Sequence, residues 1–192
     1  MTWAHMHRFL TSREDDSFQA VLAQEDRLDQ MQVAIDNEAV RLLTVYSPVA
    51  GDLRFILMVS RINTELERMG DHAVNMCEEI QLMADAGSEI PAEIPKMGKT
   101  ARGMVRDALQ AFYLADSSKA EKVIATDDIV DTLNDQVVRQ VLGQRGDISS
   151  SLAMILFAKS LERIADQATN ICEEVIYMVR GADVRHHHAE QK

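Results

Sequence analysis

The 192-residue chain is poor in the residues that favour strands and tight turns. Aromatic residues make up 5% of it, and it contains only 8 glycines and 3 prolines. Strands are enriched in aromatic residues, and turns in glycine and proline, so this composition gives few signals for either. A hydrophobic content of 46% is nevertheless ordinary for a globular protein. The composition therefore favours a protein built from helices.

Cysteine and long apolar runs are also scarce. Cys77 and Cys172 are the only two cysteines, too few for a disulfide framework, and we expect both to be small core residues in a reducing compartment. No stretch of about 18 apolar residues is free of charge, and the amino terminus lacks the apolar run of a signal peptide. We therefore expect a cytoplasmic protein that is peripheral to the membrane only through its partners.

Positive charge is in short supply as well. Asp and Glu outnumber Lys and Arg by 31 to 20, which gives a formal net charge of −11. This charge repels phosphodiester backbones and anionic membrane surfaces, so we expect no nucleic acid among the direct partners. It attracts cations instead.

Apolar residues recur every three, four or seven positions along most of the chain, which predicts long amphipathic helices. Two hairpins stand out, one turning at Pro48 and Gly51, with Asp52 as the expected helix cap, and one turning near Gly146. We predict an all-α fold of two tandem three-helix bundles, six helices in all, related by an internal repeat. The predicted helices span residues 2–10, 18–45, 53–84, 96–114, 120–142 and 149–180. The first bundle would comprise residues 1–88, with a shortened first helix, the second residues 89–181, and residues 182–192 would form a flexible tail.

The internal repeat is clearest in one acidic segment. "LERMGDHAVNMCEE" begins at residue 66, and "LERIADQATNICEE" begins at residue 161. Residues four apart share a helix face, so the acids and the asparagine of each copy line up opposite the apolar stripe. The aligned residues are Glu67, Asp71 and Asn75 in the first copy and Glu162, Asp166 and Asn170 in the second.

The other helix of each hairpin carries a matching acidic pair, Glu25 with Asp29 and Asp127 with Asp131. Residues equidistant from a hairpin turn are level, and Asp29 and Glu67 lie symmetrically about Pro48. The separation of the facing pairs is 67 − 29 = 38 residues in the first hairpin and 162 − 131 = 31 in the second. The second hairpin is therefore seven residues shorter between its acidic pairs, which is about one helical turn in each of its two helices. The sequence therefore predicts that four acids face one another in each half.

Four carboxylates this close repel by about 1 kcal/mol per pair in water and more near a protein surface. Protonation, neighbouring arginines such as Arg68 and Arg163, or bound metal would offset the repulsion. Oxygen ligands suit Mg²⁺, Ca²⁺, Mn²⁺ or iron. A single such pair would indicate only a solvated helix face, but four level pairs favour two metal sites. His72 points away from the acids, and we expect it to be a surface residue.

The segments "LAQEDRLDQMQVAIDNEAVRLL", "SPVAGDLRFILMVSRINTELERMGDHAVNM" and "LERIADQATNICEEV" resemble the PhoU family, accessory proteins of bacterial phosphate-specific transport, over nearly the whole chain. The resemblance implies multinuclear iron or zinc clusters, with manganese or magnesium as alternatives. The implied ligands are the eight acids, with Asn75 and Asn170 as weaker candidates. It also implies negative regulation of phosphate uptake and of the phosphate-starvation response. The implied partners are the ATPase subunit of the phosphate ABC transporter, a phosphate-sensing histidine kinase and a second copy in a homodimer.

Two other functions fit the same pattern. Carboxylate-bound di-metal sites in helical bundles catalyse oxidations, but these sites use Glu-x-x-His pairs, and none accompanies the acids here. No nucleophile–base pair or phosphate-binding glycine loop is visible either, so we expect no enzyme. The remaining alternative is a helical adaptor whose function does not depend on metal.

Overall fold

The computed structural model describes residues 15–86, 90–143 and 147–181. Within these residues the chain is almost entirely helical and contains no strand, so the predicted all-α fold class is confirmed. The helices are α2 (Asp15–Tyr46), α3 (Ala50–Ala86), α4 (Glu93–Leu114), α5 (Ser117–Ile124), α6 (Asp127–Gly143) and α7 (Ile148–Arg180). The predicted first helix at 2–10 and the predicted tail at 182–192 lie outside the described residues.

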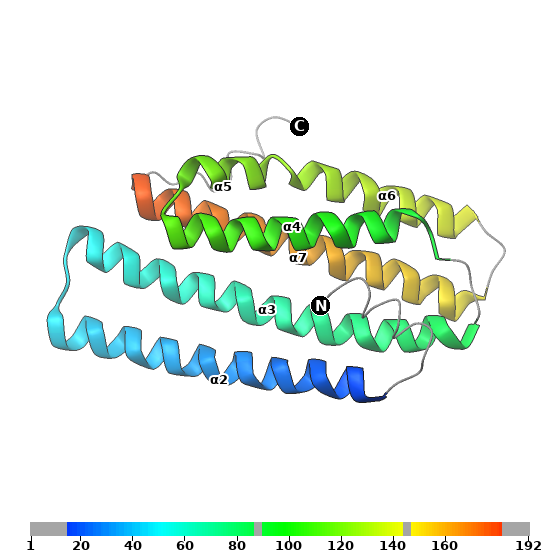
Figure 1. Ribbon diagram of the computed structural model, residues 1–192, viewed down its shortest axis with the longest axis horizontal. Helices are drawn as coiled ribbons and strands as arrows, with labels where there is room; N and C mark the ends of the chain where they lie inside the picture. The colour runs from blue at the N-terminus through cyan, green and yellow to red at the C-terminus, as the bar shows by residue number, and fades with distance from the viewer. Residues whose placement is uncertain (1–14, 87–89, 144–146, 182–192) are drawn as a thin grey trace.

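The helices run alongside one another to form an elongated bundle (Figure 1). Helices α2 and α3 form one hairpin, and α4, α5 with α6, and α7 form the second unit. Helix α3 packs along α7 and joins the two units, while α2 packs against α3. None of the helices in the described ranges is long and apolar enough to cross a membrane.

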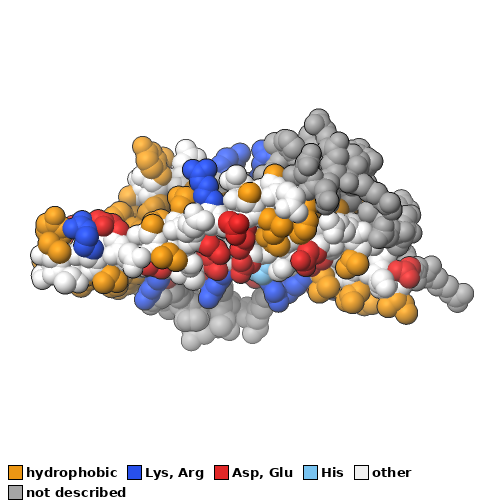
Figure 2. Space-filling model, turned by 90° about the horizontal axis from the view of Figure 1, so that it is seen from below, with side chains coloured by type: hydrophobic (Ala, Val, Ile, Leu, Met, Phe, Trp, Pro, Cys, Tyr) orange, Lys and Arg blue, Asp and Glu red, His pale blue; other side chains and the backbone are white. Residues whose placement is uncertain are grey.

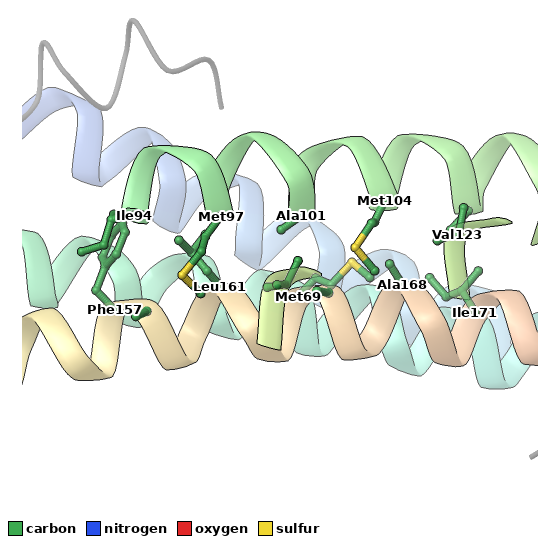
Figure 3. Packing of buried hydrophobic residues seen from close by; sticks show 14 of the residues in the cluster. Met69, Ile94, Met97, Ala101, Met104, Val123, Phe157, Leu161, Ala168 and Ile171 are labelled. Carbon is green, nitrogen blue, oxygen red and sulfur yellow. The ribbon is translucent and has the colours of Figure 1, made fainter. Parts of the chain in front are cut away.

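The core follows the interface between α3, α4 and α7. Figure 3 shows Met69, Met97 and Met104 in the space between these helices, and all three are buried. Flexible methionine side chains fill irregular gaps between helices of different direction. Cys77 and Cys172 are buried free thiols, which confirms their assignment to the core. The core is continuous from α3 through α7, and the division into two domains at residue 88 stays a prediction.

The first hairpin turns where the sequence predicts, but its cap differs. Helix α2 ends at Tyr46, and Ser47 and Ala50 adopt positive φ angles of 45° and 49°. Helix α3 already begins at Ala50, so Asp52 lies inside the first turn rather than at the N-cap. The prediction that Asp52 caps this helix is therefore wrong. Its negative charge still interacts favourably with the amino-terminal end of the helix dipole.

The predicted helix over residues 120–142 is also wrong, because the structure divides it into α5 and α6. Thr126 donates its amide to the Val123 carbonyl at 2.9 Å and its hydroxyl to the Lys122 carbonyl at 2.9 Å. The Thr126 amide thus bonds to a carbonyl three residues back instead of four, and its side chain also bonds to the backbone, so the regular α-helical hydrogen bonding is interrupted here. Asp127 and Asp128 follow in the first turn of α6, where acids favour the start of a helix. The break places Asp127 at a helix end.

Candidate functional site

The first acidic cluster lies between α2 and α3 and comprises Glu25, Asp29, Glu67 and Asp71. Burial and the charges of Asp29, Asp26, Asp71 and Glu67 raise the pKa of Glu25. Burial, followed by the charges of Asp71 and Asp29, raises the pKa of Glu67, while Arg68 lowers it. Figure 2 shows acidic side chains gathered near the middle of the face on which α2 lies, with basic side chains beside them.

The second acidic cluster lies between α6 and α7 and comprises Asp127, Asp131, Glu162 and Asp166. Burial raises the pKa of Asp127 to about 7, and the nearby charges of Asp166, Asp131, Asp128 and Glu162 add to the effect. Burial and the charges of Glu162 and Asp131 likewise raise the pKa of Asp166. The cluster therefore holds more negative charge than its environment readily stabilises.

Basic and amide groups partly compensate the second cluster. Lys159 forms an ion pair with Glu162, and the Asn134 amide donates to the same carboxylate at 3.3 Å. The positive charges of Lys159 and Arg163 lower the pKa of Asp166 and so offset part of its rise. Sequence reasoning missed Lys159 and Asn134, although their positions three residues before Glu162 and three after Asp131 would have placed both beside the acids.

The structure confirms the predicted register of both hairpins. In the first, Glu25 is within electrostatic range of Asp71, and Glu67 is within range of Asp29. In the second, Asp166 is the charge that most raises the pKa of Asp127. The two residues of each pair are the same number of residues away from the turn of their hairpin. All eight acids are therefore brought to the two places that the spacing predicts.

The two asparagines do not join the acids in the same way. Asn75 is exposed. Asn170 donates its amide to Glu65 of α3 at 3.1 Å, so this amide group is directed to the α3–α7 interface rather than to α6. Neither the exposure of Asn75 nor this hydrogen bond of Asn170 supports a role as a metal ligand, and that role stays a prediction from the resemblance.

His72 is not the surface residue that we expected. It is half-buried, and its Nδ1 atom has no hydrogen-bond partner among the described residues. Burial and the neighbouring Arg163 lower its pKa, whereas Asp71 raises it. The helical wheel of α3 alone could not show that Arg163 of α7, from the other half of the chain, lies near enough to act on His72.

The PhoU domain family matches residues 4–80 and again residues 94–175. The chain belongs to the PhoU family. It is 35% identical over 181 residues to the phosphate-specific transport system accessory protein PhoU homolog of Clostridium acetobutylicum, covering 91% of this chain and 83% of that protein. It is 31% identical over 180 residues to PhoU of Escherichia coli K12, covering 91% and 75%.

Solved structures of the PhoU family share the fold. The phosphate transport system regulatory protein PhoU from Streptococcus pneumoniae superposes with a TM-score of 0.85 at 27% identity, covering 94% of this chain and 87% of that one. PhoU from Pseudomonas aeruginosa also gives a TM-score of 0.85, at 33% identity, covering 93% and 88%. The two matched PhoU domains and these structures confirm the internal repeat and the family that the sequence suggested.

The donor chemistry of both clusters fits a hard metal ion. Asp29 and Asp127 each have a buried carboxylate oxygen, Oδ1, without a hydrogen-bond partner among the described residues. Unpaired buried oxygens are costly, and a cation would satisfy them. However, no three His, Cys, Asp or Glu side chains within residues 15–86, 90–143 and 147–181 stand close enough to enclose one ion. The clusters have suitable ligands, but their side chains are not arranged as a closed coordination shell.

The close approach of α2 to α3 depends on a small residue beside the first cluster. A Cβ atom at Gly70 would lie 3.1 Å from Leu28 Cδ1 and 3.7 Å from Glu25 Cγ. The counterpart in the second half is Ala165, whose side chain is fully buried. A methyl group is thus accommodated beside the second cluster, but the first cluster is packed too tightly to take one without a shift.

Proposed function

We propose that this PhoU protein is a metal-binding regulatory adaptor of phosphate uptake in the cytoplasm. Family membership supports the link to phosphate transport, because its relatives are named accessory proteins of the phosphate-specific transport system. The observation that carries the metal-binding part is the pair of four-acid clusters, one in each half, with raised carboxyl pKa values and one unpaired buried oxygen apiece.

Metal would bind through the carboxylates of Glu25, Asp29, Glu67 and Asp71 in one cluster and of Asp127, Asp131, Glu162 and Asp166 in the other. Its charge would offset the repulsion among the acids and tie α2 to α3 and α6 to α7. The all-oxygen donor set favours iron, manganese or magnesium over zinc, which prefers nitrogen and sulfur ligands. These ions would join the two helices of each hairpin, so metal occupancy would control the rigidity of the surface offered to partners.

The protein would act as a negative regulator when phosphate is plentiful. Its partners would be the ATPase subunit of the phosphate ABC transporter and the phosphate-sensing histidine kinase. This regulation requires binding rather than catalysis. Exposed apolar residues at both ends of the bundle, such as Tyr113, Val49 and Ile148, provide surfaces of the kind that proteins use to bind one another.

The test is complementation of a strain that lacks its own PhoU protein. The wild-type chain should restore repression of a phosphate-starvation reporter, such as alkaline phosphatase, in high phosphate. A variant with Glu67→Gln, Asp71→Asn, Glu162→Gln and Asp166→Asn should fail to repress while accumulating to the same level. A control with Asp135→Asn, an exposed acid of α6 that pairs with Arg139, should behave as wild type.

The complementation result separates metal-dependent from metal-independent regulation. Full repression by the four-acid variant would contradict a regulatory role for the clusters and would leave a metal-independent adaptor. Failure of the wild-type chain to repress would contradict the regulatory proposal as a whole.

A further inference from the structure

The interface between α3 and α7 has two ends that the internal repeat relates to each other. The amino-terminal part of α3 meets the carboxy-terminal part of α7, since Arg54 donates to the Met178 carbonyl at 3.2 Å. Both helices carry copies of the same repeated segment and run antiparallel. Each contact near one end of the interface is therefore expected to have an equivalent near the other end.

At the first end, a buried acid is neutralised within the chain. Glu174 of α7 is buried, and Arg61 of α3 donates from Nη1 to its two carboxylate oxygens at 3.3 Å each. We call this end the Arg61 surface; it comprises Leu53, Leu57, Arg61, Glu174 and Tyr177. Leu57 is 44% exposed beside the ion pair.

At the second end, the equivalent acid has no such cation. Aligning the two repeated segments pairs Glu79, the last residue of the first "CEE", with Glu174, the last residue of the second. The same alignment pairs Arg61, five residues before the first segment, with Leu156, five residues before the second. Leucine thus replaces arginine at the equivalent position.

Glu79 is consequently buried without a full counter-charge. It is 9% exposed, and Ser160 donates its hydroxyl to both carboxylate oxygens at 3.4 Å. Among the described residues no Lys or Arg forms an ion pair with it. Burial raises its pKa to about 7, the Ser160 hydrogen bond lowers it, the charge of Glu78 on α3 raises it and that of Arg163 on α7 lowers it. A buried carboxylate without a close cation is unfavourable.

Exposed apolar side chains lie on both helices at this end of the interface. Leu82 of α3 and Ile148, Leu152 and Leu156 of α7 are all exposed, and the last three are spaced four residues apart on one helix face. We call this end the Glu79 surface; it comprises Glu79, Leu82, Ile148, Leu152 and Leu156. It lies where α3 ends and α7 begins (Figure 1).

We propose that the Glu79 surface binds a helix of a partner protein that places one arginine or lysine against Glu79 and apolar side chains against the exposed leucines. The incoming cation takes the place that Arg61 occupies at the other end. Apolar side chains at helical spacing give a docking helix its contact area, and the charge pair fixes its register. The Arg61 surface has similar leucines but already contains its cation, so it lacks this complementarity.

This inference rests on the proposed function, which supplies the partner to be tested. The assay measures binding of the full chain to the purified transporter ATPase subunit from the same organism at pH 6.5 and pH 8, by biolayer interferometry. Glu79→Gln removes the charge and keeps the shape. Leu156→Arg supplies the missing cation from within the chain. Leu57→Arg is the matched control, because Leu57 and Leu156 are both 44% exposed.

The two variants of the Glu79 surface should each weaken binding at pH 8 about tenfold or more, and Leu57→Arg should change it less than about twofold. Pairing with a cation lowers the pKa of Glu79, so binding releases a proton. Wild-type affinity should therefore be higher at pH 8 than at pH 6.5, and Glu79→Gln should abolish this difference.

Four results would overturn the inference. Unchanged binding by both variants would show that the partner docks elsewhere and would leave the proposed function intact. Equal weakening by Leu57→Arg would show a general apolar contact without a role for Glu79. Dissociation of a self-associated chain by Leu156→Arg, seen by analytical ultracentrifugation, would show that a second copy occupies the surface. If the wild-type chain does not bind the ATPase subunit at all, both this inference and the proposed partnership are contradicted.

Discussion

Replacing Glu79 by glutamine should stabilise the protein at neutral and alkaline pH. Burial raises the pKa of this carboxyl from 4.5 to about 7. Each tenfold change in acidity corresponds to about 1.4 kcal/mol, so ionised Glu79 costs the folded state at most about 3 kcal/mol. Glutamine has nearly the same shape and can still accept the Ser160 hydroxyl, but it carries no charge to bury.

The sign of the pH dependence follows from proton binding. Between pH 4.5 and about 7 the folded chain holds a proton on Glu79 that the unfolded chain has released. The contribution of Glu79 to the free energy of unfolding therefore falls as pH rises through this range and stays low above it. Glu79→Gln should match wild type at pH 4.5 and exceed it by up to about 3 kcal/mol at pH 8.

Urea denaturation followed by circular dichroism, in the presence of a chelator, measures this difference at both pH values. Glu174→Gln is the matched control, since it removes the equivalent carboxylate from its ion pair with Arg61 and should lower stability at pH 8. A Glu79→Gln variant whose stability relative to wild type is the same at pH 4.5 and pH 8 would refute the assignment of Glu79 as a strained buried acid.

Three further predictions concern the acidic clusters and the core. In chelator at pH 8, Asp127→Asn should raise the free energy of unfolding by about 1–3 kcal/mol, because it relieves burial and repulsion of a carboxyl whose pKa is about 7; urea denaturation checks this, and a loss of stability would contradict it. Gly70→Ala should lower the urea midpoint, because overpacking by a methyl group 3.1 Å from Leu28 Cδ1, at about 1–3 kcal/mol, should exceed the roughly 1 kcal/mol that alanine gains inside a helix. A raised midpoint would show that Leu28 and α2 give way to the methyl group. Burial raises the pKa of Cys77 to about 11 and that of Cys172 to about 12, so labelling of both by a disulfide reagent at pH 8 should occur only as fast as the protein unfolds; rapid labelling of the folded chain would contradict this.

The helices and their register could be predicted from the sequence because both depend on local periodicity. Apolar spacing located the long helices, and the symmetry of the acids about Pro48 gave the pairing of Glu67 with Asp29. The break between α5 and α6 could not be predicted in this way. It depends on Thr126 bonding back to backbone carbonyls, which competes with helix continuation without disturbing the apolar pattern.

The site was predictable within each hairpin but not across the two halves. Glu67 and Asp71 share a helix face, and the other acids of each cluster follow from the turns. The environments of His72 and Glu79 depend on α7 packing against α3, which periodicity does not reveal. One signal was present in the sequence: aligning the two repeats places Leu156 where Arg61 stands, and that difference marks Glu79 as the acid without its cation.

The most direct test of the central claim is the metal content of the purified protein, measured by elemental analysis. Wild-type chain purified without a tag should carry more than one atom of iron, manganese, magnesium or zinc per chain. The variant with Glu67→Gln, Asp71→Asn, Glu162→Gln and Asp166→Asn should lose it while keeping its helical circular dichroism, and the Asp135→Asn control should retain it. Equal metal content in all three proteins, or none in any of them after supplementation with each ion, would contradict a metal-binding role for the two acidic clusters.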